Sequence, residues 1–282
     1  MSAIALRRER RPRPGRIALY VLLVALAIFY LLPVYVALVT SLKSFVEVSN
    51  STPWDLPKGA TLDAYGDALG KLTHGFVNSA FLVIPGTLLS ALLGSLNGYV
   101  LSKWRFRGSN VVFTLLLFGM FIPYQSVLIP LVTTLQQLRL YGGILGLILV
   151  HVVYGIPITT LIFRNYYAAI PTELVEAARV DGSSVLGIYR HVVLPLSMPA
   201  FVVVLIWQFT SIWNEFLFGV TIVSDPAQQP ITVALNGIAG SLLAQYQIQM
   251  AGALLTALPP LVIYIALGRY FIRGLLAGAL KG

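Results

Sequence analysis

Six stretches of about 20 or more mostly apolar residues divide the 282-residue chain and constrain its fold more than any other feature. The acidic or basic side chains inside these stretches are His151, Glu215 and Arg164, and Arg164 lies near the end of the fourth stretch. About 20 residues of helix cross a hydrocarbon core about 30 Å thick. We therefore predict an all-α, polytopic membrane protein. Its six spans are expected near 17–40, 76–101, 110–131, 144–165, 200–223 and 248–268.

The composition excludes an ordinary water-soluble domain. Of all residues, 57% are hydrophobic and 10% are charged, whereas soluble domains carry roughly 25% charged residues. The absence of Cys excludes disulfides, thiolate metal sites and a cysteine nucleophile. The first apolar stretch, Ile17 to Thr40, exceeds the 7–15 residues typical of a signal-peptide core, so we expect it to remain as a membrane anchor.

Basic residues are distributed asymmetrically among the polar segments. With the N-terminus inside, 15 of the 19 Lys and Arg residues fall on the cytoplasmic side, and Lys43, Lys58, Lys71 and Arg139 fall outside. The positive-inside rule then predicts that both termini are cytoplasmic. We expect a basic cytoplasmic tail (1–16), a six-helix permease domain (17–271) and a cytoplasmic C-terminal tail (272–282). This juxtamembrane placement accounts for the net charge of +9 without a nucleic-acid partner.

Two further local features carry structural predictions. Residues Thr61 to Leu72 have apolar residues at helical spacing and predict a small separate helix. Proline removes a backbone donor and favours a kink within a helix. We therefore expect kinks at the prolines inside the predicted spans, which are Pro85, Pro123, Pro130, Pro157, Pro259 and Pro260. Broken helices suit a transporter, but prolines are common in membrane spans of all kinds.

The segment between the fourth and fifth spans, residues 166–199, predicts a helix–turn–helix on the cytoplasmic side. Pro171 and Thr172 can open the first helix, and Gly182 is placed to close it in a left-handed turn. Ser183 or Ser184 can cap a second helix. We expect Leu194-Pro195 to end the second helix before the fifth span.

This segment has the character of a docking surface. The small residues Ala177, Ala178 and Gly182 permit close approach of another protein. Apolar side chains are expected to supply contact area. They are Leu174, Val175, Val185, Leu186, Ile188 and Tyr189. A rigid helix pair joined to two spans would transmit a push from a soluble partner into the membrane.

The triplet Glu176-Ala177-Ala178, followed by Gly182 and by Leu194-Pro195, resembles the E-A-A loop of permease subunits in ATP-binding-cassette importers. The segments Phe163 to Tyr167 and Trp213 to Leu217, and the C-terminal end from Gly274, are similar to the carbohydrate branch, specifically the maltose-type second permease. Residues Asn97 to Asn110 look closest to glucose/mannose-type permeases. The resemblance implies a type I importer permease fold.

The resemblance also implies a set of partners. They are a homologous permease, two cytoplasmic ATPase subunits and a periplasmic or lipid-anchored sugar-binding protein, assembled in a bacterial plasma membrane. The residues expected to dock the ATPase are Glu176, Ala177, Ala178, Asp181, Gly182, Leu194 and Pro195. The chain has no Gly-x-x-x-x-Gly-Lys-Ser/Thr phosphate cradle, so we expect no cofactor here, and we assign ATP and Mg²⁺ to the ATPase chains. The chain itself is then a transport subunit and not an enzyme.

Polar and aromatic side chains within the spans are candidates for a substrate path. Glu215 lies about 16 residues into the fifth span, roughly 24 Å from its cytoplasmic start. An ionisable residue inside a span is a functional candidate, although pairing or solvation near the interface is an equal alternative. The candidate set is Tyr124, Gln125, His151, Tyr154, Trp213, Asn214 and Glu215. Each one is also compatible with hydrogen bonding between helices.

Two other functions remain open at this point, an ion-coupled transporter and an importer of another cargo, whereas a membrane-embedded enzyme is disfavoured because the side chains it needs are missing. An ion-coupled secondary transporter would usually carry several charges at the membrane midplane and an internal repeat. A membrane-embedded enzyme would need clustered His, Asp or Glu side chains. An importer of polyamines or peptides is compatible with the docking loop, because that loop carries no information about cargo.

Overall fold

The computed structural model describes residues 14–104, 106–240 and 245–279, and every regular element within them is helical. The long helix α3 (Asp63–Lys103) forms the axis of the molecule. Three further long helices, α6 (Ile144–Ala168), α10 (Met198–Trp213) and α13 (Tyr246–Ala279), pack along it. At 41 residues, α3 is roughly 60 Å long and therefore exceeds the thickness of a hydrocarbon core.

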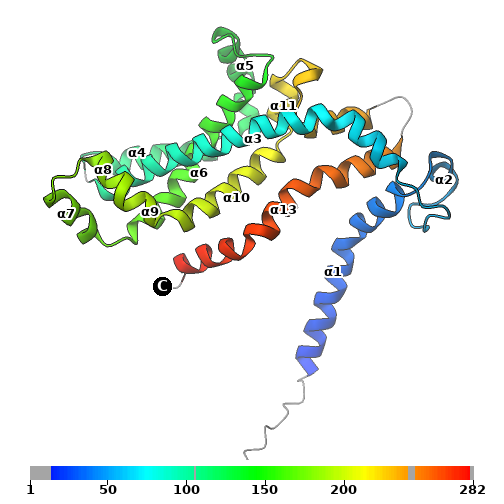
Figure 1. Ribbon diagram of the computed structural model, residues 1–282, viewed down its shortest axis with the longest axis horizontal. Coiled ribbons are helices and arrows are strands. Elements are labelled where there is room, and N and C mark those ends of the chain that lie inside the picture. Colours follow the sequence, from blue (N-terminus) through cyan, green and yellow to red (C-terminus); the bar gives the residue numbers. More distant parts are fainter. Residues whose placement is uncertain (1–13, 105, 241–244, 280–282) are drawn as a thin grey trace, which may run out of the picture.

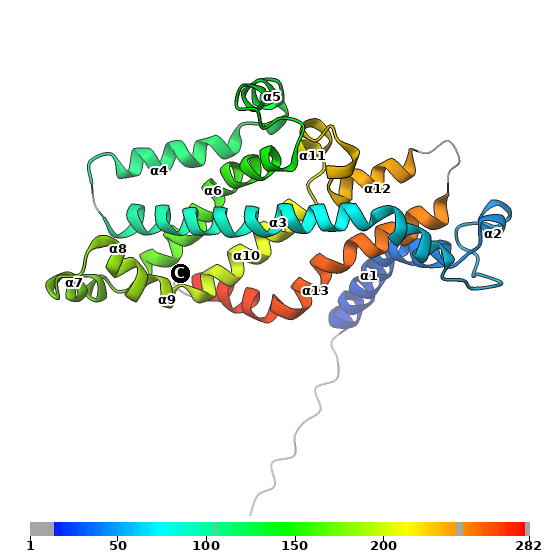
Figure 2. The ribbon, with the colours of Figure 1, turned by 45° about the horizontal axis from the view of Figure 1, so that its top comes forward.

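Short helices cluster at the two ends and on one side of this bundle (Figures 1 and 2). Helix α2 (Phe45–Asn50) lies at one end, and α7 (Thr172–Val180) and α8 (Val185–Ile188) lie at the other. A π-helix (Tyr189–Val193) and α9 (Leu194–Leu196) join α8 to α10. The remaining elements are α4 (Ser109–Phe118), α5 (Leu128–Gln137), α11 (Leu217–Ile222), α12 (Ile231–Ala239) and the 3₁₀ turns Gly119–Phe121, Tyr124–Val127 and Pro226–Gln228.

Four helical segments are long and apolar enough to cross a membrane by themselves. They are Gly15–Ser41, Asp63–Lys103, Ile144–Ala168 and Tyr246–Arg269. Two bent pairs meet the same criteria together: Ser109–Phe121 with Tyr124–Gln137, bent by 93°, and Val185–Leu196 with Met198–Trp213, bent by 78°. The chain is therefore a multi-pass membrane protein, and its described residues supply four to six candidate spans, according to how the bent pairs are counted.

Two of the predicted spans are broken. The stretch 110–131 divides at Ile122, because Pro123 cannot donate the helical hydrogen bond and a new 3₁₀ turn begins at Tyr124. The stretch 200–223 divides between Trp213 and Leu217. Apolarity predicts residence in the membrane, but it does not distinguish a straight helix from two bent ones.

Two other local predictions also change. The small helix expected over Thr61 to Leu72 is the first part of α3, because its buried residues Ala64, Ala68 and Leu72 continue along the same helix. Helices α3, α6 and α13 run through Pro85, Pro157, Pro259 and Pro260, and Pro130 lies in the first turn of α5. At Pro123 the expected kink is instead a complete break of the helix; at the other five prolines the kinks stay a prediction.

Among the described helices, the most extensive contact joins α3 to α6. A Cβ atom added at Gly94 would lie 2.0 Å from the Thr159 hydroxyl oxygen, and one added at Gly98 would lie 2.8 Å from the Arg164 nitrogen. Small residues at such positions let membrane helices approach closely. Thr159 in turn donates to the carbonyl oxygen of Ser90 at 3.0 Å. This interface holds α6 in a fixed position on α3.

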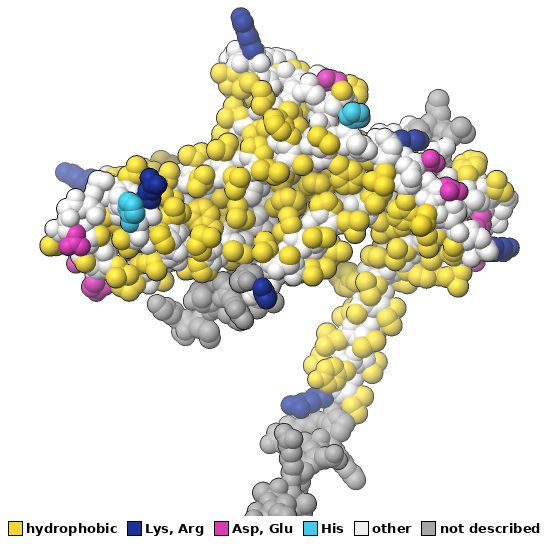
Figure 3. Space-filling view, in the orientation of Figure 1, with side chains coloured by type: hydrophobic (Ala, Val, Ile, Leu, Met, Phe, Trp, Pro, Cys, Tyr) yellow, Lys and Arg dark blue, Asp and Glu magenta, His cyan; other side chains and the backbone are white. Residues whose placement is uncertain are grey.

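Helix α1 (Pro14–Ser41) diverges from the bundle (Figure 1). Its side chains form a long apolar surface in Figure 3, and large ones such as Phe29 and Tyr30 are exposed. The end of α1 contacts α13, and Val39, Thr40 and Ser41 are buried there. Of the predicted tail over 1–16, residues 1–13 lie outside the described part of the chain. Helix α13 continues through Ala279 into the predicted C-terminal tail, of which residues 280–282 lie outside the described part.

Candidate functional site

Residues 166–199, which we call the coupling segment, form two short helices at one end of the bundle (Figure 1). Helix α7 ends at Val180, and Gly182 adopts a left-handed φ of +80°. The N–H of Gly182 donates to Arg179 O and the N–H of Ser183 donates to Ala178 O, each at 3.0 Å. These two bonds define a Schellman motif, so the predicted left-handed turn at Gly182 is confirmed.

The second helix begins as predicted at a serine. The Ser184 hydroxyl accepts the N–H of Gly187 at 3.1 Å and so caps α8. The helical path then continues through the π-helix and α9 to Leu196, one residue beyond Pro195. The bend into α10 follows at Ser197, whose hydroxyl donates to Leu194 O at 2.7 Å. The second helix therefore ends directly after Leu194-Pro195 and before the fifth predicted span, as expected.

The coupling segment is anchored on the end of α3 by buried tyrosines. The Ser95 hydroxyl lies 2.6 Å from Tyr167 OH and 2.8 Å from Tyr189 OH, all three being buried. Tyr99 donates its hydroxyl to Val185 O at 3.0 Å, and its ring lies 5.4 Å from that of Tyr189. Buried polar groups that are fully hydrogen-bonded rigidify a core.

Cationic side chains add two further connections at this end. The Lys103 ammonium donates to Ile170 O, immediately before α7. The Arg179 guanidinium lies 4.5 Å from the centre of the Trp104 ring, a cation–π geometry. The coupling segment is thus held at both of its helices by α3 and the residues that follow it.

The apolar side chains of the coupling segment divide between two faces. Val175, Ile188 and Tyr189 are buried in the core of the chain and are unavailable to a partner, contrary to the prediction. Leu174, Val185 and Leu186 are exposed, as is Val180, which the sequence analysis did not select and which is 88% exposed. The helices are too short for periodicity to identify the outward face, which is why the prediction failed there.

The residues expected to dock an ATPase lie mainly on the outward face. Glu176, Ala177, Asp181, Gly182 and Pro195 are exposed, whereas Ala178 and Leu194 are half-buried. A Cβ atom added at Gly182 would meet nothing within 4 Å. Within this chain, Gly182 is therefore required by its backbone conformation and not by crowding.

A second arrangement forms where the fifth predicted span is broken, and we call it the Phe218 cluster: Tyr124, His151, Tyr154, Glu215 and Phe218. The Phe218 ring lies 5.4 Å from Tyr124, 5.9 Å from His151 and 5.1 Å from Tyr154, measured between ring centres. These residues come from three separate parts of the chain: the turn after α4, helix α6 and the start of α11. The cluster is aromatic, with exposed rings at Tyr124 and Tyr154 and a buried one at Phe218.

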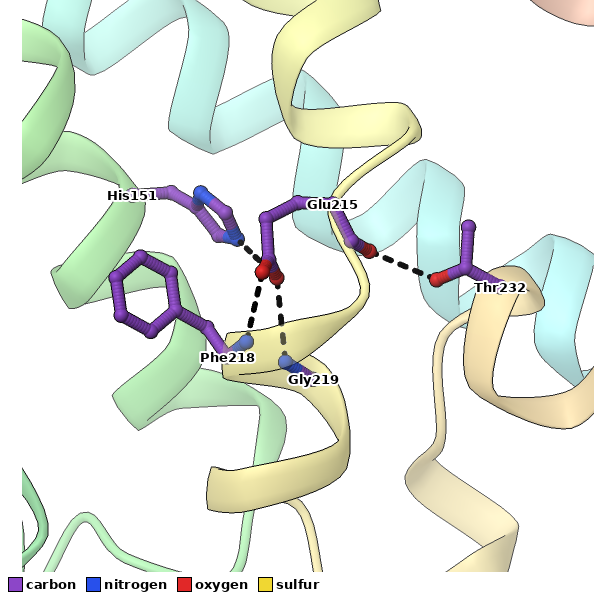
Figure 4. Close-up of polar contacts among 5 residues, drawn as sticks. All are labelled: His151, Glu215, Phe218, Gly219 and Thr232. Carbon is purple, nitrogen blue, oxygen red and sulfur yellow. Dashed lines mark hydrogen bonds and ion pairs between the residues drawn. The ribbon is translucent and has the colours of Figure 1, made fainter. Parts of the chain in front are cut away.

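The Glu215 carboxylate occupies the helix break (Figure 4). Its two oxygens accept the N–H groups of Phe218 at 2.7 Å and Gly219 at 3.2 Å, which are unpaired donors at the start of α11. The Nε2 atom of His151 lies 3.7 Å from the same carboxylate. The backbone oxygen of Glu215 accepts the Thr232 hydroxyl at 2.8 Å. Glu215 thus joins α6, α11 and α12.

Three candidate path residues lie outside the Phe218 cluster. Trp213 is buried, stacks on Phe209 with ring centres 5.6 Å apart, and donates its indole N–H to Thr256 O at 3.0 Å. It stabilises the contact of α10 with α13 and offers no free face to a cargo molecule. Asn214 is exposed, with its amide bonded to Thr210 O of its own helix, and Gln125 is exposed beside Tyr124.

Phe218 is the residue that the sequence analysis missed at this site. It lies three positions after Glu215 in an apolar run, and nothing in its chemistry separates it from its apolar neighbours. The same holds for Ser95 and Tyr99 at the coupling segment, since their roles depend on contacts more than 60 positions away in sequence. Among the described residues, no group of three or more His, Cys, Asp or Glu side chains is placed to hold a metal ion.

Comparison with known proteins agrees with this geometry. The chain is 49% identical over 97% of its length to a probable ABC transporter permease protein of Pyrococcus horikoshii, and covers all of that protein. It is 38% identical over 92% of its length to the xylose/arabinose import permease protein XacI of Haloferax volcanii, and covers 92% of it. Both similarities extend over nearly the complete chains.

The fold has a close counterpart among solved structures. A chain of a bacterial ABC transporter involved in the import of the acidic polysaccharide alginate superposes with a TM-score of 0.80 at 24% identity, over 93% of this chain and 99% of the other. Residues 86–276 match the family model described as binding-protein-dependent transport system inner membrane component. This range includes the coupling segment and the Phe218 cluster. The chain belongs to that family, the permease subunits of ABC transporters.

Proposed function

We propose that the chain is the permease subunit of an ATP-driven sugar importer, in which two cytoplasmic ATPase subunits act on the membrane helices through the coupling segment. The observation that carries the proposal is the arrangement of that segment. Its outer face exposes small and apolar side chains. Its inner face packs against α3, α6 and α10. Such a unit moves as one body with the helices when a partner moves it.

Sugar as the cargo rests on two lines of support. The relative from Haloferax volcanii is named for xylose and arabinose import. In the Phe218 cluster, the exposed rings of Tyr124 and Tyr154 pack on the ring of Phe218, whose N–H is bound by the Glu215 carboxylate. Aromatic faces combined with polar groups are suited to sugars, which have apolar faces and many hydroxyls. The path we propose passes Tyr124, Tyr154 and Glu215, with Gln125 and Asn214 at its exposed margin. A glucose or mannose cargo stays a prediction.

The proposed orientation places both termini and the coupling segment in the cytoplasm of a bacterial cell. Basic residues in and near the coupling segment, among them Lys103, Arg164 and Arg190, support this orientation. Six crossings result if the two bent pairs each count as a span. The proposed partners are a homologous permease, the two ATPases, which bind ATP and Mg²⁺, and an extracytoplasmic binding protein that delivers the sugar.

Docking is tested by substitution on the exposed face of α7. Ala177→Arg introduces a long charged side chain while preserving helix propensity, because Arg and Ala are both good helix formers. We expect this variant to insert and fold but to lose the ATPase subunits on purification. Ala60→Arg, at an exposed position near the opposite end of α3, is the matched control and retains them. An Ala177→Arg complex that keeps its ATPases and transports normally would refute the proposed docking face.

The energy source and cargo are tested in proteoliposomes that contain the complete importer. Uptake should require ATP on the side of the coupling segment and persist when ion gradients are collapsed, whereas an ion-coupled secondary transporter would show the reverse. Identification of the ligand that co-purifies with the binding protein distinguishes a sugar from a polyamine or peptide. Retention of a non-sugar ligand would overturn the cargo and leave the docking mechanism intact.

A further inference from the structure

A buried lysine lies at the end of the molecule opposite the coupling segment and takes no part in the proposed function. Lys43 follows α1 by two residues and is 1% exposed. Its ammonium donates to Ser51 Oγ at 3.1 Å and to Thr52 O at 2.8 Å. An ammonium carries three N–H donors, and these bonds use two of them.

The oxygens that Lys43 contacts are both uncharged. Among the described residues, His151 and Glu215 are the only basic and acidic side chains that lie within 4 Å of each other, so no described carboxylate approaches the Lys43 ammonium to that distance. The nearby Asp55 carboxylate accepts the N–H of Thr52 at 2.8 Å, and this bond, together with the charges of Lys43 and Lys58, lowers the pKa of the Asp55 carboxyl. A buried charge is costly unless a counter-ion contacts it directly, and Asp55 stays more than 4 Å from the Lys43 ammonium. Lys43 is therefore predisposed to bind an anion.

The ammonium borders a cavity of about 260 Å³ between α1, α2 and α13. Val36, Val48 and Met250 line its apolar part, and Thr40, Lys43 and Tyr246 contribute polar groups. Pockets for drug-sized ligands are roughly 300–1,000 Å³. This cavity is smaller, so it suits a small anionic group attached to the beginning of an apolar chain.

The cavity lies at the level where a membrane meets water. The apolar helix α1 ends at Ser41, and exposed aromatic side chains surround the cavity. Trp54 is 56% exposed and Tyr246 is 52% exposed, and Tyr35 donates its hydroxyl to Trp54 O at 2.9 Å. Tyr and Trp are enriched at the depth of lipid headgroups.

We propose that this cavity binds the phosphate headgroup of an anionic phospholipid, with the phosphate on Lys43 and the first acyl carbons against Val36 and Met250. A free sugar would find few hydrogen-bonding partners in such an apolar cavity, and a free phosphate would leave the apolar part empty. The lipid would connect α1 to α13 at the point where α1 leaves the bundle. The site is independent of ATPase docking and of the cargo path.

The test is native mass spectrometry of the complete importer, reconstituted with phosphatidylglycerol and then gently released. A single basic residue at a membrane surface changes anionic-lipid affinity about fivefold. We expect Lys43→Gln, which keeps a donor but removes the charge, to reduce retained phosphatidylglycerol by about that factor. Lys43→Arg should retain the lipid. Lys58→Gln, an exposed lysine in the same excursion, is the matched control and should match the unsubstituted importer.

A second variant covers the case in which Lys43→Gln fails to assemble. Met250→Trp fills the apolar part of the cavity while leaving Lys43 in place, and should also reduce retained lipid. Undiminished lipid in an assembled Lys43→Gln or Met250→Trp complex would overturn the proposal. Displacement of the lipid by inorganic phosphate alone would reassign the site to free anions. Cross-linking of Met250 to a partner permease would replace the lipid with a protein contact.

Discussion

The Glu215 carboxylate lies 3.7 Å from Nε2 of His151 while its two oxygens accept the first free N–H groups of α11. An acidic side chain inside a membrane span is expensive unless it is paired and hydrogen-bonded. Here both carboxylate oxygens are hydrogen-bonded, because the break after Trp213 leaves backbone donors that need an acceptor. The functional candidate chosen from sequence is thus also the residue that stabilises the broken helix.

Removing the carboxylate is predicted to destabilise the break. Glu215→Ala leaves the N–H groups of Phe218 and Gly219 without acceptors, and hydrogen bonds to charged groups contribute about 1.5–3 kcal/mol. We expect the free energy of unfolding to fall by about 2 kcal/mol. Glu215→Gln keeps one oxygen acceptor and should lose less. Thermal denaturation of the purified importer measures both changes.

Asn214→Ala is the control for this pair, since the Asn214 side chain is exposed and bonds within its own helix. It should leave the melting temperature nearly unchanged. Normal stability of Glu215→Ala would contradict the capping role. If Glu215→Gln is stable but imports poorly, the charge acts on the cargo as well as on the helix.

Two substitutions at Gly182 distinguish strain in the left-handed turn from a steric clash with a partner. Asn adopts left-handed φ more readily than other non-glycine residues, whereas a β-branched residue resists it. Gly182→Asn should therefore preserve the Schellman motif, while Gly182→Val should strain the turn by about 1–2 kcal/mol. Because an added side chain meets nothing in this chain, any loss of ATPase binding by Gly182→Asn would reflect a clash with the partner.

Co-purification of the ATPase subunits and cargo-stimulated ATP hydrolysis measure these outcomes. We expect Gly182→Val to fail in both assays and to remain inserted in the membrane. Wild-type coupling by Gly182→Val would show that the left-handed turn is unnecessary for docking.

The tyrosine pair on Ser95 is predicted to transmit movement between the coupling segment and α3. Tyr189→Phe keeps the ring but removes the hydroxyl that lies 2.8 Å from Ser95, a loss of about 1 kcal/mol. We expect ATP hydrolysis to continue with less transport per ATP, because the segment is held less rigidly. Tyr20→Phe, on the exposed surface of α1, is the control. An unchanged transport-to-hydrolysis ratio would argue against this role.

The contact of α3 with α6 is predicted to tolerate no side chain at Gly94. A Cβ there would lie 2.0 Å from the Thr159 hydroxyl oxygen, and overpacking of this kind costs about 1–3 kcal/mol. Gly94→Ala should lower the melting temperature. Gly66→Ala, in the same helix with nothing within 4 Å, should be neutral or raise it, because Ala favours helix over Gly. Equal behaviour of the two variants would contradict the packing.

The sequence by itself determined the class of the molecule. Apolar stretches with few charges require helices in a membrane, since lipid offers no hydrogen bonds to an unpaired backbone. The left-handed turn at Gly182 and the cap at Ser184 were also predicted correctly, because each depends on residues within a few positions. The spacing of Glu176, Gly182 and Pro195 identified the family, because this motif can be read from the sequence without knowledge of the fold.

The tertiary structure alone decided which of these residues face outward and which meet. Val175 and Tyr189 turned inward and Val180 outward, because short helices take their orientation from the surface beneath them. Trp213 is buried in the core and does not line the candidate path. Phe218 contacts Tyr124, Tyr154 and His151, which come from other parts of the chain. Such contacts cannot be predicted from the positions of the residues in the sequence. Packing between helices determines them only after the helices have formed.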